Sequence, residues 1–131
     1  LASSAQVLAL KPDAAILAGL DVGVVGPAAG SGASAPRGKV GVVGRSDADG
    51  IAFEVRAFFP GNNGLAEDPV TGSLNAALAQ WLIGAGLAPA QYVASQGTCL
   101  GRAGRVHVQQ EGDTIWVGGH SVTCMAGEVL L

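Results

Sequence analysis

The chain has 131 residues, which is the length of one ordinary domain that can bury a core of its own. Its net charge of −3 and its scattered basic residues argue against nucleic acid or an anionic membrane surface as a partner. Charged residues make up only 13% of the chain, so we expect a surface that is poor in charge and partly covered by another domain or subunit.

No apolar run reaches the roughly 18 residues needed to cross a bilayer, and no signal-peptide pattern opens the chain. The two cysteines, Cys99 and Cys124, are too few for a disulfide framework and are interpreted as buried thiols, which favours a reducing, cytoplasmic setting. The chain starts at Leu1 without an initiator Met, which suggests an excised portion of a longer product, although a trimmed chain would look the same. His107 and His120 lack the spacing of metal ligands, so we expect no metal site.

In chain order, the first part of the sequence predicts short elements separated by small residues. A weak alternation predicts an edge strand over residues 5–10, and a Lys-Pro-Asp start predicts a short helix over residues 11–20. Strands are expected at 22–26 and 39–44. Between them, residues 27–38 are rich in Gly, Ser, Ala and Pro and predict a loop.

A strand over residues 51–59 then leads through a glycine-rich turn to a helix over residues 74–83. Apolar residues at i, i+3, i+4, i+7 and i+8 define one face of this helix, and further apolar residues fill the opposite face. A helix that is apolar nearly all round belongs inside a domain, so something must wrap it. Gly84 and Gly86 are expected to end the helix, and Pro89 prevents its continuation.

Short strands follow this helix, at residues 91–96, 105–110, 114–118 and 121–131. Several consecutive strands after one buried helix predict an antiparallel or mixed sheet that curls around the helix. We therefore predict a single α+β domain over residues 1–131, with a sheet curled around a central helix.

The start of the helix carries the candidate site. Asp68 or Thr71 can act as the N-cap, and Thr71-Gly72-Ser73 offers backbone N–H groups and two hydroxyls where the helix dipole favours a carboxylate or a phosphate. Asp68, held near apolar walls and this helix start, is the candidate for acid–base chemistry at carbon. The alternative interpretation is an ordinary capped helix in which Asp68 is only a cap or an ion-pair partner.

Motifs along the second half of the chain carry a family resemblance. The main one is Glu67-Asp68-Pro69-Val70-Thr71-Gly72-Ser73. The others, in order, are Arg56-Ala57-Phe58-Phe59-Pro60-Gly61, Gln96-Gly97, Leu100-Gly101-Arg102, Gly104-Arg105-Val106, Trp116-Val117-Gly118-Gly119 and Val122-Thr123-Cys124. Together they resemble the PhzF family of phenazine-biosynthesis-like proteins, which are relatives of diaminopimelate epimerase. The resemblance covers residues 50–131 well and the first fifty residues loosely.

The resemblance implies one half of a two-half enzyme with a diaminopimelate epimerase-like fold, in which a barrel-like sheet encloses a central helix. It places the active site in the cleft between the halves. It also implies cofactor-free proton transfer at carbon on a small carboxylate-bearing substrate, with Asp68 as the catalytic residue. The residues expected to hold the substrate carboxylate are Thr71, Gly72 and Ser73. Candidate supporting residues are Glu67, Gly64 and Arg56, although an exposed strand arginine in a surface ion pair is the more ordinary interpretation of Arg56.

Two hypotheses follow. In the first, the chain is the C-terminal half of a PhzF-like isomerase, incomplete and inactive alone because the glutamate-bearing motif of the first half is not found. The missing partner is then an N-terminal half or a second copy of the chain. In the second, the chain is a non-catalytic carboxylate-binding module that forms a homodimer imitating the two halves.

Overall fold

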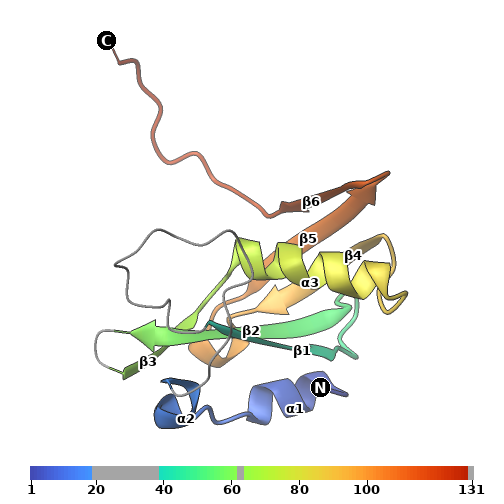
Figure 1. The fold of residues 1–131 in the computed structure, drawn as a ribbon. Helices are drawn as coiled ribbons and strands as arrows, with labels where there is room; N and C mark the ends of the chain where they lie inside the picture. The colour runs from blue at the N-terminus through green and yellow to red at the C-terminus, as the bar shows by residue number, and fades with distance from the viewer. Residues whose placement is uncertain (19–38, 62–63, 130–131) are drawn as a thin grey trace, which may run out of the picture.

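The computed structural model describes residues 1–18, 39–61 and 64–129 of the chain. The strand predicted at 22–26 and the loop predicted at 27–38 therefore lie outside the described residues. The described elements, in chain order (Figure 1), are α1 (Ser4–Ala9), α2 (Ala14–Ala18), β1 (Val40–Arg45), β2 (Phe53–Gly61), β3 (Gly64–Asp68), α3 (Gly72–Gly84), β4 (Gln91–Gln96), the 3-10 turn η1 (Thr98–Leu100), β5 (Gly104–Glu111) and β6 (Thr114–Gly118).

Six strands form one mixed sheet in the order β1-β2-β4-β5-β6, with β3 paired to β2 beside this path. The β2–β4 pair is parallel and the other pairs are antiparallel. Strand β4 pairs with the start of β2 at Phe53–Val55 and β3 with its end from Ala57 onward, so both lie along the edge of β2 opposite β1. The α+β class and the strands predicted around β1, β2, β4, β5 and β6 are confirmed.

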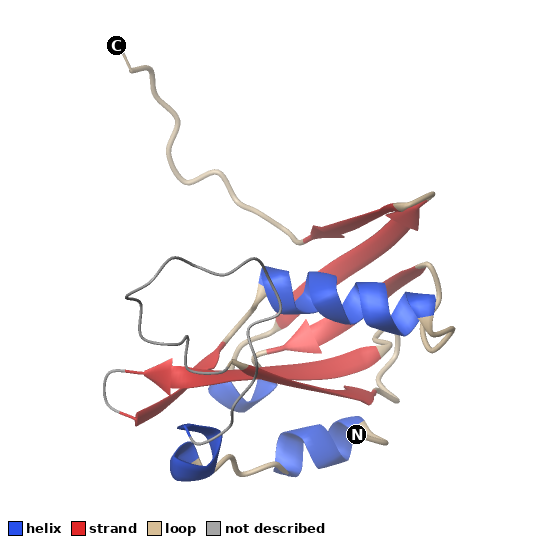
Figure 2. Ribbon diagram, viewed as in Figure 1, coloured by secondary structure: helices blue, strands red, loops and turns tan. Residues whose placement is uncertain are grey.

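The core lies between α3 and one face of the sheet (Figure 2). Helix α3 turns Ala79 and Leu82 toward the sheet, where they meet alternate side chains of the strands. Burial of each large apolar side chain stabilises the fold by roughly 1.5–3 kcal/mol. The buried cluster consists of Phe53, Val55, Ala79, Leu82, Tyr92, Ala94, Val106 and Val108.

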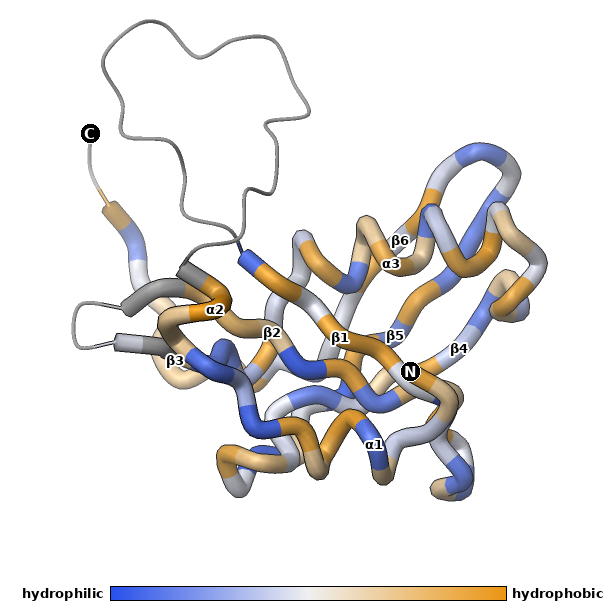
Figure 3. The backbone as a smooth tube through the Cα atoms, turned by 60° about the horizontal axis from the view of Figure 1, so that its bottom comes forward, coloured by the Kyte–Doolittle hydropathy of each residue, from blue (hydrophilic) through white to orange (hydrophobic). Residues whose placement is uncertain are grey.

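The prediction that a barrel-like sheet encloses this helix is not confirmed within the described residues. In the described part of the chain the sheet is open, since no pairing joins β1 to β6, and α3 is covered on one face only. Ala77 and Trp81, which the i, i+3, i+4 pattern places on one apolar face of a helix expected to be buried all round, are exposed, with Trp81 at 58%. Hydrophobic residues recur along the whole of α3 (Figure 3), so hydropathy did not distinguish its two faces. Asn75, whose side chain is hydrogen-bonded inward, sets the rotation instead.

Helix α1 lies against β1 and β2 on the sheet face opposite α3 (Figure 1). An edge strand at 5–10 is therefore the wrong prediction, and a missed helix-start signal, Ser3 followed three residues later by Gln6, explains it. The Ser3 Oγ accepts from the Gln6 backbone N–H at 3.3 Å, and Gln6 Oε1 accepts from the Ala2 N–H at 2.9 Å. The next helix, α2, confirms the prediction for the described part of 11–20, since the Asp13 carboxylate accepts from its first N–H groups.

The C-terminal segment leaves the sheet after β6 as an extended chain (Figure 1). A strand over 121–131 is a wrong prediction for residues 121–129, which have no regular structure; residues 130–131 lie outside the described part. Alternating residues form a strand only beside a partner strand, and none pairs with this segment within the described residues. Cys124 in this segment and Cys99 in η1 are exposed free thiols rather than buried ones. Across the described residues, no helix combines the length and apolarity needed to span a membrane.

Candidate active site at the start of α3

A pocket of about 250 Å³ opens where β3 ends and α3 begins. Its apolar wall comes from β1, the end of β2 and the first turn of α3. Three of the residues selected from the sequence, Asp68, Thr71 and Ser73, line this one pocket. The full lining is Lys39, Val40, Gly41, Ala57, Phe58, Phe59, Asp68, Thr71, Ser73 and Leu74.

Asp68 is the last residue of β3 and lies opposite Ala57 of β2. Its carboxylate accepts one hydrogen bond, from the Val70 N–H to Oδ1 at 3.3 Å, and is half-buried. Among the described residues that line the pocket, Asp68 is the only acid. The carboxylate therefore retains acceptor positions for a ligand.

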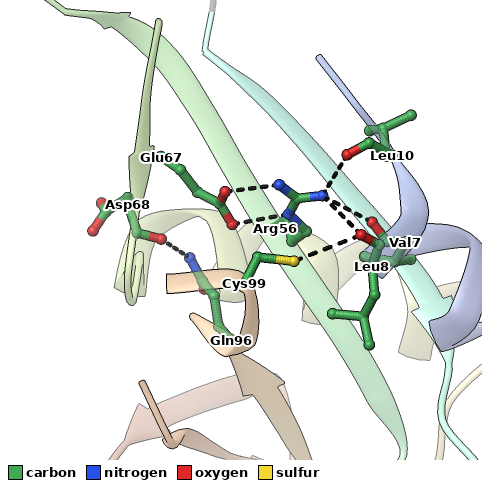
Figure 4. Close-up of polar contacts among 8 residues, drawn as sticks. All are labelled: Val7, Leu8, Leu10, Arg56, Glu67, Asp68, Gln96 and Cys99. Carbon is green, nitrogen blue, oxygen red and sulfur yellow. Dashed lines mark hydrogen bonds and ion pairs between the residues drawn. The ribbon is translucent and has the colours of Figure 1, made fainter. Parts of the chain in front are cut away.

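Thr71, rather than Asp68, is the N-cap of α3, but its hydroxyl does not bond to the helix. Thr71 is hydrogen-bonded instead to the buried side-chain amide of Gln96, the last residue of β4. Gln96 Nε2 donates to Thr71 Oγ1 at 3.1 Å, and Gln96 Oε1 accepts from the Thr71 N–H at 3.2 Å. The amide also reaches the backbone of Asp68, because Nε2 donates to the Asp68 carbonyl at 3.0 Å (Figure 4).

The first backbone hydrogen bond of α3 runs from the Asn75 N–H to the Thr71 carbonyl at 3.1 Å. The preceding N–H groups of Gly72, Ser73 and Leu74 have no acceptor among the described residues. Unpaired N–H groups at a helix start, together with the helix dipole, favour an anion. The predicted open helix start is thus present for Gly72 and Ser73, whereas the N–H and the hydroxyl oxygen of Thr71, which were also expected to be free, are both hydrogen-bonded to Gln96.

The remaining predicted residues lie outside the pocket lining. Glu67 precedes Asp68 in β3, and the two side chains point in different directions: Glu67 toward Arg56, and Asp68 away from it (Figure 4). Arg56 is buried, so the expectation of an exposed strand arginine is wrong, and its ion-pair partner in the structure is Glu67. Gly64 begins β3 with a φ of 112°, a conformation that favours glycine.

Arg56 joins three parts of the chain through its guanidinium. It makes two hydrogen bonds to Glu67, and Nη1 donates to the carbonyls of Val7 at 3.1 Å and Leu10 at 2.7 Å (Figure 4). The hydrogen-bonded Glu67 carboxylate raises the pKa of Arg56, although desolvation acts in the opposite direction. Arg56 therefore ties the strand that carries Asp68 to α1, away from the pocket.

Sequence reasoning missed two residues of the site. Lys39 lies just before β1 and lines the pocket, yet it stands 29 positions from Asp68, so only the β1–β2–β3 pairing brings the two together. Gln96 ends β4 and is fully buried, and the one available signal was its place in the Gln96-Gly97 motif. Neither residue has a local pattern that predicts contact with a helix start.

Residues 1–127 match the family described as "Phenazine biosynthesis-like protein", and the chain belongs to this PhzC-PhzF family. The resemblance seen in the motifs is thereby confirmed. A protein of Pasteurella multocida that is named an uncharacterized isomerase is 37% identical over 78 residues, which are 59% of this chain and 27% of that protein. The matched part thus spans about a quarter of the relative. No solved structure shows a significant match.

Proposed function

We propose that the chain forms part of a cofactor-independent isomerase or epimerase that transfers protons at carbon on a small carboxylate-bearing substrate. Family membership and the isomerase name of the Pasteurella relative support this class of reaction. The observation that carries the proposal is the meeting of Asp68, Thr71 and Ser73 on one pocket, beside unpaired N–H groups of α3.

In the proposed reaction, the N–H groups of Gly72, Ser73 and Leu74 hold the substrate carboxylate. A base removes a proton from a carbon, the electron pair is delocalised over the substrate, and a proton is delivered to carbon again. The helix start stabilises the negative charge that grows on the substrate during this transfer. Asp68 is one of the two proton-transferring groups.

The second proton-transferring group is expected from another part of the enzyme. Among the described pocket residues Asp68 is the only acid, and the aligned region makes up 27% of the Pasteurella relative. An N-terminal half that carries a glutamate base, or a second copy of this chain, would close the pocket. This part of the proposal follows the family resemblance.

Lys39 supports an anionic substrate. Lys39 and Asp68 carry opposite charges and line the same pocket, yet they form no ion pair, the one described ion pair being Arg56–Glu67. A ligand anion can therefore meet Lys39 without displacing a carboxylate of the described residues. An acid–base group and a cation held apart suit a substrate that presents an anionic group next to a reacting carbon.

The test incubates the full-length enzyme in deuterated water with a panel of cyclic and amino carboxylic acids. Mass spectrometry then measures how fast carbon-bound hydrogen of each acid is exchanged for deuterium. Asp68→Asn should lower the exchange rate by about 10²–10⁴-fold, the usual worth of a general acid–base group. Asp113→Asn, in the exposed turn before β6, is the matched control. Undiminished exchange in Asp68→Asn would remove Asp68 from the reaction.

A second candidate function is a non-catalytic carboxylate-binding module that acts as a homodimer. The exposed apolar face of α3, with Trp81 at 58%, favours a covering partner. Analytical ultracentrifugation combined with a carboxylate titration separates the two functions. A dimer with two equal carboxylate sites and no hydrogen exchange favours the binding module, whereas a monomer that binds no carboxylate excludes it.

A further inference from the structure

The side chain of Gln96 is fixed in one orientation at the base of the candidate site. It is 0% exposed and uses both ends of its amide. Oε1 accepts from the Thr71 N–H and from Asn75 Nδ2, at 3.2 and 2.8 Å, and Nε2 donates to Asp68 O and Thr71 Oγ1, at 3.0 and 3.1 Å. An amide flipped end for end would place donors against donors, so the observed orientation alone satisfies its partners.

This orientation decides what the Thr71 hydroxyl does. A threonine at an N-cap ordinarily accepts a hydrogen bond from the N–H of the second or third helical residue. In this chain those residues are Ser73 and Leu74, and Thr71 makes no such bond. Its oxygen is directed to Gln96 Nε2 instead. The hydroxyl is thus withdrawn from the cap by a residue of a distant strand.

We propose that Gln96 is a positioning residue that keeps the start of α3 uncapped, so that the N–H groups of Ser73 and Leu74 remain available to a substrate carboxylate. The same amide holds the Asp68 backbone, so one side chain fixes the acid and the carboxylate-binding N–H groups relative to each other. This inference rests on the proposed function. It adds the means by which the anion site is kept open.

A purely structural role for Gln96 predicts a different set of effects. If Gln96 only satisfied buried polar groups, its replacement would lower stability without a specific change at the helix start. If Gln96 holds the hydroxyl away, its replacement releases Thr71 to cap the helix, and the N–H groups of Ser73 and Leu74 become protected. The two roles are separated by measurements at these amides.

The first experiment measures solvent exchange of the Ser73 and Leu74 amide protons by NMR. In Thr71→Val the rates should stay within about twofold of wild type, because the hydroxyl caps neither group; in Gln96→Met they should fall at least fivefold. Gln91→Met, at an exposed position of the same strand, is the matched control. Faster exchange in Thr71→Val would show that the cap exists and would overturn the proposal, even if Gln96→Met fails to fold.

The second experiment titrates benzoate as a carboxylate probe and follows the same amides. Gln96→Met should weaken binding at least fivefold when Thr71 is present and by less than twofold in the Thr71→Val background. An equal loss in both backgrounds would overturn the proposal. If benzoate shifts neither amide in the wild-type protein, the proposed carboxylate site is wrong, whereas the exchange rates still decide whether Gln96 controls the cap.

Discussion

Arg56 and Glu67 face each other in a two-pronged ion pair, with Nε 2.9 Å from Oε1 and Nη2 2.8 Å from Oε2. Their side chains are only 7% and 11% exposed. Glu67 directly precedes Asp68, and Arg56 also binds carbonyls beyond the pair, in α1 and just after it. The ion pair therefore connects the strand that carries the candidate acid to an N-terminal helix.

Replacement of Arg56 should destabilise the fold strongly. Arg56→Met leaves the Glu67 carboxylate buried without its partner, and the loss of one member of a buried pair costs about 3–5 kcal/mol. The free energy of unfolding from urea titration measures this cost. Arg102→Met, at an exposed position, is the control and should change it by less than about 0.5 kcal/mol. A cost near the control value would mean that the pair is solvated.

The one-sided burial of α3 can be tested with two alanines of the same helix. Ala79 is fully buried against the sheet and Ala77 is exposed. Ala79→Leu should destabilise by about 1–3 kcal/mol because it overpacks the core. Ala77→Leu should stay within about 0.5 kcal/mol. Comparable destabilisation by both substitutions would show that the outer face is covered in solution.

Lys39 should contribute to anion binding through charge alone. Lys39→Met is expected to weaken benzoate binding up to about fivefold at low salt, since exposed ion pairs are worth about 0.2–1 kcal/mol. The difference should shrink as salt is added, because exposed charges are screened. Lys11→Met, which removes the same charge away from the pocket, is the control. An equal effect of both substitutions would indicate net charge rather than a contact in the pocket.

Tyr92 should make the free energy of unfolding depend on pH in the alkaline range. Burial raises the pKa of Tyr92 above its ordinary value of 10.0. As pH rises, the unfolded chain therefore loses the phenol proton before the folded chain does. The contribution of Tyr92 to the free energy of unfolding is complete below pH 10 and is lost as pH rises toward the folded-state pKa. Unfolding titrations on both sides of pH 10 should show this decline, and Tyr92→Phe should reduce it. As the chain has one tyrosine, phenolate absorbance reports this group directly.

Much of the fold follows from local sequence patterns, and the errors have identifiable causes. The alternation around residues 51–59 predicts β2 correctly. The strand forms there because β1 and β4 supply partner strands on its two edges. Residues 121–129 alternate less clearly and have no partner in the described sheet, so they stay extended. At the N-terminus, Ser3 and Gln6 cap a helix that a weak alternation obscured.

The candidate site was predictable only where it is continuous in sequence. Asp68, Thr71 and Ser73 lie within six residues and share one pocket, as the family motif implies. Strand pairing brings Lys39 and Gln96 to the site, so no spacing along the chain predicts that they belong to it. The rotation of α3 about its axis was not predicted for a related reason. The hydrogen bond from Asn75 to Gln96 directs Asn75 inward, and hydropathy does not predict a buried asparagine.

The exposed face of α3 can be followed by tryptophan fluorescence. The chain has two tryptophans, and both are largely in water: Trp81 on α3 at 58% exposure and Trp116 on β6 at 60%. Their fluorescence should be red-shifted in the isolated chain. If a second polypeptide seats itself over the helix, the Trp81 emission should move to shorter wavelength and its accessibility to iodide should drop. Trp81→Phe would then remove the spectral change.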